Sequence, residues 1–241
     1  MPTKVAVCQV PDIREDIKAS LKWIEKFVND AEKKEVSLIG FPECFLQGYL
    51  TEKISAQKYA INLQSKVFAN ILLQLAKYNP MIVFGLIEKE NGLLFNTAVV
   101  IKDGLLIGKY RKTHLLEGET AFTVGSEYPI FEINDLKFGI NICYDTQFPE
   151  ATANLTKQGA KMILCVSNTM MRYENAIKYK HLHFSMRAER VKEKQVWMLS
   201  TDVTGERAGR IAYGSTSVIN PDGELVKQVP FMKTDMITVT M

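Results

Sequence analysis

The sequence is poor in the features that mark exported, membrane-spanning and disordered chains. Its 241 residues include only 4 cysteines, 8 prolines and 14 glycines, so neither a disulfide framework nor a fibrous or disordered composition is indicated. No apolar run approaches the roughly 20 residues needed to cross a bilayer. No apolar run of signal-peptide length precedes the polar residue Asp12. We therefore expect a cytoplasmic protein that has no membrane partner.

Metal-ligand patterns and basic runs are also missing. The cysteines are dispersed, form no C-x-x-C pair and show no ligand-like spacing to the 3 histidines, so we expect no metal and no cofactor. Lys and Arg number 30 against 27 Asp and Glu, and the basic residues are scattered. Nucleic acid is therefore not an expected partner.

What is present is an alternation of strand-like and helix-like segments. Apolar residues recur at helical spacing over residues 12–34, 65–78 and 176–194, whereas residues 37–41 and 136–142 are compact apolar runs typical of buried strands. No linker-like stretch or internal repeat interrupts this order. The pattern predicts an α/β fold with helices covering a mixed sheet or a pair of sheets, in one domain spanning residues 1–241.

Three polar residues, Glu43, Lys112 and Cys143, stand at the ends of the strands predicted over residues 37–41, 105–110 and 136–142. Loops at strand ends commonly build the active sites of α/β proteins. Taken singly, each residue also has an ordinary structural explanation. Glu43 could cap a loop, Lys112 could be a solvated lysine, and Cys143 could be a small buried hydrophobe.

The residues after Cys143 favour a reactive thiol. A helix is predicted from Pro149, so a tight strand-to-helix passage would expose the sulfur and aim backbone N–H groups towards it. That environment favours a thiolate. His114 is an alternative base for such a thiol, and the spacing does not exclude a Cys–His dyad. The other cysteines, Cys8, Cys44 and Cys165, are expected to serve packing.

Three motifs resemble those of the nitrilase (carbon–nitrogen hydrolase) superfamily, in its amidase-like branch. They are Phe41-Pro42-Glu43 with Gly48-Tyr49, Tyr110-Arg111-Lys112-Thr113-His114-Leu115, and Asn141-Ile142-Cys143-Tyr144-Asp145 with Phe148-Pro149-Glu150. Their order and spacing match the family, and the resemblance spans nearly the whole chain. It implies a four-layer α-β-β-α sandwich that forms a homodimer or a higher homo-oligomer.

The resemblance also implies the chemistry. Cys143 would be the nucleophile, Glu43 the general base and Lys112 the oxyanion partner, with Tyr49, Tyr144 and Asn168 bordering the substrate. The implied reaction cleaves a non-peptide C–N bond of a small linear amide, ω-amide or carbamoyl compound and releases ammonia or an amine. Nitrile hydrolysis, acyl transfer and a non-catalytic small-molecule-binding role remain alternatives.

One departure from the family pattern concerns a second glutamate in the loop after Lys112. The expected position is occupied by Gly118, with Glu117 and Glu119 on either side of it. A contraction of the loop by one residue would place Glu119 there. We therefore expect Glu119 to be the fourth catalytic residue, with Glu117 as the alternative.

Overall fold

The computed structural model describes residues 2–241, in which 14 strands and six α-helices follow one another along the chain. The strands are β1 (Lys4–Pro11), β2 (Leu38–Gly40), β3 (Met81–Glu90), β4 (Leu93–Lys102), β5 (Leu105–Arg111), β6 (Phe131–Ile133), β7 (Leu136–Ile142), β8 (Met162–Val166), β9 (Met171–Arg172), β10 (Trp197–Arg207), β11 (Arg210–Ala212), β12 (Ser217–Ile219), β13 (Leu225–Gln228) and β14 (Asp235–Thr240). The helices are α1 (Ile17–Glu32), α2 (Lys53–Tyr59), α3 (Lys66–Leu75), α4 (Pro149–Lys157), α5 (Tyr173–Tyr179) and α6 (Leu182–Lys194), and a short 3-10 helix, η1 (Cys143–Gln147), joins β7 to α4.

The strands form one continuous path in the order β5-β4-β3-β2-β1-β10-β8-β7-β6. The central strands β2, β1, β10, β8 and β7 run parallel, and hairpins add antiparallel strands at both ends. Strand β1 pairs with β14 along most of its length and with β10 only at its C-terminal end. This change of partner lets the two halves of the path diverge and face each other.

Side chains alternate between two cores along β1. Val5 and Val7 belong to a buried cluster that also holds Val83 of β3 and Ile140 of β7, so this cluster fills the space between the two halves. Ala6, Cys8 and Val10 point the other way, as expected for a strand whose side chains alternate in direction.

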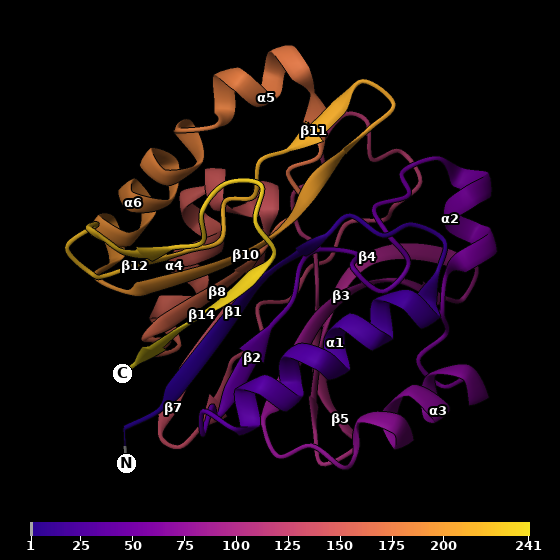
Figure 1. Cartoon of the computed structure of the whole chain (residues 1–241), viewed down its shortest axis with the longest axis horizontal. Helices are drawn as coiled ribbons and strands as arrows, with labels where there is room; N and C mark the ends of the chain where they lie inside the picture. Colours follow the sequence, from indigo (N-terminus) through magenta and orange to yellow (C-terminus); the bar gives the residue numbers. More distant parts are fainter. Residues whose placement is uncertain (1) are drawn as a thin grey trace.

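Helices cover the two outer faces. A second cluster packs α1 and α3 against one half, and a third packs α4 and α6 against the other. Figure 1 shows α1 and α3 in front of β2 and β5, with α4 and α6 on the opposite flank. The predicted four-layer α-β-β-α sandwich in a single domain is confirmed.

Helix α3 ends at Leu75, three residues before its predicted end, and two further helices differ more from their predicted ranges. The first begins at Ile17 because β1 runs on to Pro11, and the carboxylate of Asp16 then caps the helix by accepting the N–H of Ala19 at 2.9 Å. The helix predicted over 176–194 is divided into α5 and α6. Helix α5 buries only Ala176, so packing does not hold it on the axis of α6.

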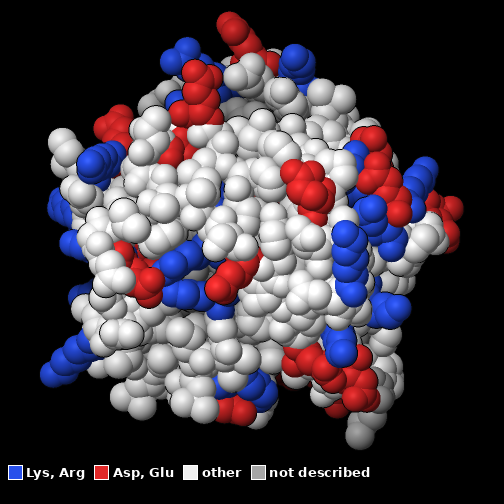
Figure 2. Space-filling view, turned by 180° about the vertical axis from the view of Figure 1, so that it is seen from behind, with Lys and Arg blue, Asp and Glu red and all other residues white. Residues whose placement is uncertain are grey.

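The surface carries charges of both signs. Figure 2 shows Lys and Arg interspersed with Asp and Glu over one face of the molecule, in keeping with the scattered charges of the sequence. Among residues 2–241, no helix is long and apolar enough to cross a membrane.

Candidate active site

Four polar side chains from distant parts of the chain meet in the interior, near the C-terminal ends of β2 and β5. Glu43 follows β2, Lys112 follows β5, and Glu119 lies in the long loop between β5 and β6. The ammonium Nζ of Lys112 lies 2.8 Å from Oε1 of Glu43 and 2.9 Å from both carboxylate oxygens of Glu119. All three side chains are about 99% buried.

Asn96 of β4 is the fourth member of this cluster, and the sequence analysis did not identify it. Its amide Nδ2 donates to Oε1 of Glu43 at 2.7 Å and to Oε1 of Glu119 at 3.1 Å. It thereby separates two carboxylates that would otherwise repel each other. The one available signal was the pair of polar residues Asn96 and Thr97 within the largely apolar strand Leu93–Lys102.

The two glutamates differ in how fully their oxygens are used. Glu119 accepts hydrogen bonds from Lys112, Asn96 and the N–H of Leu116, so that each of its oxygens receives two donors. In Glu43, Oε1 also receives two donors, but Oε2 receives only the N–H of Asn168, at 3.0 Å. Since each carboxylate oxygen can accept two bonds, Oε2 of Glu43 can accept a further proton donor.

Burial and charge set the protonation of the cluster. Burial raises the pKa of Glu43 above its ordinary value, although the ammonium of Lys112 pulls it down. Burial opposes the charge on Lys112, but Glu43, Cys143 and Glu119 outweigh this effect and raise its pKa. Lys112 therefore stays a cation at neutral pH, and Glu43 gains basicity relative to an exposed glutamate.

Cys143 stands at the junction between β7 and η1. Its backbone φ is +46°, in the left-handed region that a non-glycine residue rarely adopts. Such strain is typical of functional positions. Unlike the other cysteines, which are buried, Cys143 is partly exposed. Burial and the negative charge of Glu43 raise the pKa of its thiol despite the nearby Lys112, so the resting sulfur is protonated and needs a base.

Asp145 connects the cysteine loop, which begins at Cys143, to the lysine loop, which begins at Lys112, through hydrogen bonds. Its Oδ2 accepts the N–H of Ile142 at 2.9 Å and the hydroxyl of Tyr110 at 2.8 Å, while Oδ1 accepts the N–H groups of Thr113 at 3.2 Å and His114 at 2.9 Å. The carboxylate is fully buried. The sequence analysis placed Asp145 in the cysteine motif but gave it no role. Only the structure reveals its partners.

Gly85 of β3 allows the Glu43 loop to come close to the sheet. A Cβ atom at this position would lie 2.3 Å from the N of Cys44 and 2.6 Å from the carbonyl oxygen of Pro42. Neither backbone atom can move aside without moving the loop. A side chain here would therefore displace Glu43.

Two cavities open at Cys143. One, of about 310 Å³, is also lined by Tyr49 and Asn168. The other, of about 400 Å³, is lined by Tyr144. The three residues expected at the substrate thus all lie at cavities that contain the thiol.

The alternatives considered from the sequence are placed elsewhere. Glu117 is exposed. The ring of His114 stacks on Phe148 at 3.8 Å, and its Nδ1 lies 3.2 Å from Asp145. His114 lines neither cavity at Cys143. The structure thus brings Glu119, rather than Glu117 or His114, into the polar cluster.

The other three cysteines lie in the interior, away from the cavities at Cys143. Cys8, Cys44 and Cys165 are completely buried, and burial raises the pKa of each thiol. Cys44 follows Glu43 directly, but its sulfur donates to Oδ1 of Asn96 at 3.4 Å. Within the part of the chain that the structure describes, no three His, Cys, Asp or Glu side chains are grouped so that they could hold a metal ion.

Comparisons with known proteins identify the family and the fold of the chain. The family model described as carbon-nitrogen hydrolase matches residues 4–241. A nitrilase of Pyrococcus abyssi is 31% identical over 92% of this chain and 83% of its own length, and the omega-amidase Nit3 of Saccharomyces cerevisiae is 27% identical over 93% and 82%. The solved structure of that yeast protein has a TM-score of 0.87 at 25% identity, covering 99% of this chain and 89% of its own. An amidase of Nesterenkonia AN1 has the same fold, with a TM-score of 0.85 at 22% identity over 99% and 90%.

Proposed function

The chain belongs to the carbon–nitrogen hydrolase family of the nitrilase superfamily, and we propose that it is an amidase that cleaves small linear amides through a thioester on Cys143. The observation that carries the proposal is the position of the Lys112 ammonium, 2.8–2.9 Å from two buried glutamates. Cys143, which lines two cavities, lies close enough to Lys112 and Glu43 for their charges to shift the pKa of its thiol. This arrangement offers a nucleophile, a base and a cation together.

Acylation begins with proton transfer from the Cys143 thiol to Oε2 of Glu43, the oxygen with room for another donor. The sulfur forms a bond to the amide carbon, and the carbonyl electron pair moves onto oxygen. Lys112 and the backbone N–H of Tyr144 stabilise this oxyanion. Glu43 then gives its proton to the amide nitrogen, the C–N bond breaks, and ammonia or an amine leaves.

Deacylation repeats these steps with water. Glu43 takes a proton from the water as its oxygen attacks the thioester carbon. The C–S bond breaks when the tetrahedral intermediate collapses, the sulfur recovers the proton from Glu43, and the carboxylic acid is released. Glu119 cannot act as this base, because Lys112, Asn96 and Leu116 already occupy its oxygens. We assign it to positioning Lys112.

Nitrile hydrolysis and acyl transfer would use the same nucleophile. Nitrile hydrolysis also needs water, whereas acyl transfer needs a second amine to reach the thioester. A non-catalytic role would leave the raised pKa of Glu43 and the strained backbone of Cys143 without a purpose. The amidase proposal is favoured over a non-catalytic role because it uses every member of the cluster.

The test is ammonia release from succinamate, glutaramate, an N-carbamoyl amino acid, propionamide and propionitrile. We expect amide turnover by the wild-type protein and none by Cys143→Ala. Cys8→Ala is the matched control, since it removes a buried thiol outside both cavities and should lower stability while keeping the rate. Release from propionitrile but not from propionamide would favour nitrile hydrolysis. A Cys143→Ala protein with most of the wild-type rate would overturn the proposal.

The proposed base has a separate test in Glu43→Gln. Glutamine keeps the shape and the hydrogen bonds of Glu43 but cannot accept the thiol proton. We expect kcat to fall far more than KM rises, with the fold intact by circular dichroism. An unchanged kcat with a lower melting temperature would reduce Glu43 to a structural residue.

We further propose that the chain forms a homodimer through α5 and α6. Ile177 is 63% exposed, and Tyr173, Leu182 and Phe184 are also exposed on these two helices. Grouped apolar side chains of this kind are typical of protein interfaces. Light scattering should give twice the chain mass for the wild type and the chain mass for Ile177→Asp. A monomeric wild type would contradict the proposal.

A further inference from the structure

Arginine side chains form a row across three neighbouring strands near the active site. Strand β11 lies between β10 and β9, and Arg210 of β11 pairs directly with Arg207 of β10 and with Arg172 of β9. Residues directly opposite each other in antiparallel strands project from the same face, and like charges there destabilise the pairing. Figure 1 shows this small sheet extending beyond the sandwich next to α5.

One of the three arginines is neutralised within the protein. Arg207 forms an ion pair with Asp12, whose side chain is 5% exposed. Among residues 2–241, neither Arg172 nor Arg210 has a carboxylate within ion-pair distance. The nearby carboxylate of Glu206 raises the pKa of the Tyr173 phenol, and it forms an ion pair with neither arginine. Two adjacent positive charges therefore remain without a counter-charge.

These two arginines line the same cavity as the nucleophile. The cavity of about 310 Å³ that contains Cys143, Tyr49 and Asn168 is also bounded by Arg172 and Arg210. A substrate whose amide carbon reaches Cys143 therefore lies in a space with two exposed guanidinium groups. Guanidinium groups bind carboxylates through paired N–H donors, and they stay charged at every physiological pH.

We infer that Arg172 and Arg210 bind a carboxylate of the substrate, so that the enzyme selects amides that carry a negative charge at a distance from the scissile bond. This inference rests on the proposed amidase function. The bound anion would also relieve the repulsion between the paired arginines. The charge of the substrate would then be recognised by residues of β9 and β11, which are separate from the residues that carry out the reaction.

A third arginine at the active site is not suited to this task. Arg187 lines the other cavity, but it is 4% exposed and donates to Oγ of Ser200 at 2.9 Å, to the carbonyl oxygen of Ser215 at 2.8 Å and to Oγ of Ser167 at 3.2 Å. Its donors hold the wall of the site together. We expect its replacement to impair folding.

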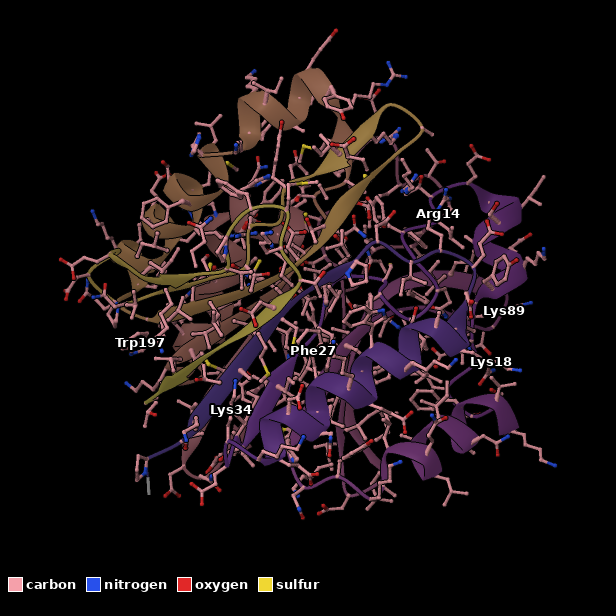
Figure 3. All side chains as sticks on the ribbon, viewed as in Figure 1. Arg14, Lys18, Phe27, Lys34, Lys89 and Trp197 are labelled. Atoms are coloured by element: carbon pink, nitrogen blue, oxygen red, sulfur yellow. The ribbon has the colours of Figure 1, made fainter. Side chains whose placement is uncertain are left out.

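The experiment compares kcat/KM for amides of matched length that differ in the charge at the far end. Succinamate and glutaramate carry a carboxylate, butyramide and valeramide are neutral, and 4-aminobutyramide is cationic. Arg172→Gln and Arg210→Gln each remove one charge. Lys34→Gln is the matched control, because Lys34 is exposed beyond the C-terminal end of α1, and Figure 3 shows it at the end of the molecule away from β11.

We expect the wild type to prefer the anionic amides over the neutral ones by at least about tenfold, which corresponds to about 1.4 kcal/mol. Each arginine variant should lower that preference about tenfold, and added salt should weaken it because the arginines are exposed. Lys34→Gln should keep the preference. Replacing both Arg172 and Arg210 with glutamate should favour 4-aminobutyramide over succinamate, a gain that a misfolded protein could not show.

Binding of the same probes to Cys143→Ala, measured by calorimetry, separates this inference from the proposed function. If no amide is hydrolysed but succinamate binds more tightly than butyramide and loses that advantage in Arg172→Gln, the anion site stands and the amidase proposal fails. If amides are hydrolysed without any charge preference in the wild type, the amidase proposal stands and the anion site is refuted.

Discussion

Replacing Lys112 with methionine should destabilise the protein in a way that depends on pH. The ammonium is buried between Glu43 and Glu119 at 2.8–2.9 Å, and methionine fills similar space without charge. Two buried carboxylates would then share only the amide of Asn96. Breaking a buried ion pair in this manner costs about 3–5 kcal/mol.

The pH dependence follows from the carboxylates. The pKa of Glu43 is already raised by burial, and removing Lys112 removes a charge that lowers it. A folded-state pKa above the unfolded value favours folding at low pH, and that contribution is lost as the pH rises. Lys112→Met should therefore be least stable at neutral and higher pH, and its stability should recover as the pH falls and Glu43 takes up a proton.

The assay is thermal unfolding across pH, paired with ammonia release. A loss of about 3–5 kcal/mol corresponds to a melting temperature about 6–20 °C lower for a chain of this size, and loss of the oxyanion donor should lower kcat by about 10²- to 10³-fold. Adding Glu119→Gln should restore much of the stability and none of the activity. A Lys112→Met protein that melts like the wild type at pH 7.5, or that loses stability on acidification instead, would refute this reasoning.

Three further predictions concern residues around the cluster. Asp145→Asn should lower kcat at least about tenfold by weakening charge-assisted hydrogen bonds to the lysine loop; steady-state kinetics at wild-type rates would contradict this. Gly85→Ala should displace the Glu43 loop and lower kcat, since its Cβ would lie 2.3 Å from a backbone nitrogen; an alanine variant with normal kcat would show that the loop can yield. Burial and Arg187 lower the pKa of His183 to about 4, so its contribution to stability is present above the unfolded value near 6.5 and is lost as the pH falls towards 4. His183→Gln should flatten the acid limb of the melting-temperature profile, and an unchanged profile would exclude His183 as its source.

The parts of the fold that the sequence predicted are those with strong periodicity. The alternating and continuous apolar runs located β7 without error, and Pro149 marked the start of α4. Helix α2 was not anticipated, because its seven residues bury only Ala56 and carry too short an apolar pattern. The division between α5 and α6 has no breaker residue in the sequence, and it depends on packing.

The candidate site was accessible from the sequence only where motifs are local. Glu43, Lys112 and Cys143 follow strands and lie in recognisable segments. Asn96 was missed because it lies inside a largely apolar strand and its partners lie 23 and 53 residues away. The paired arginines of β9 and β11 were missed for the same reason, since their register depends on a two-residue strand that no periodicity signals.

The central claim is that Cys143 carries the acyl group during turnover, and acid quenching with peptide mass spectrometry tests it most directly. The wild type is mixed with the amide that gives the fastest ammonia release, quenched within the first turnovers and digested at low pH to preserve the thioester. The account predicts an added acyl mass on the peptide that contains Cys143, and none in Cys143→Ala. An acyl mass on a different residue, or turnover without any acylated peptide, would contradict it.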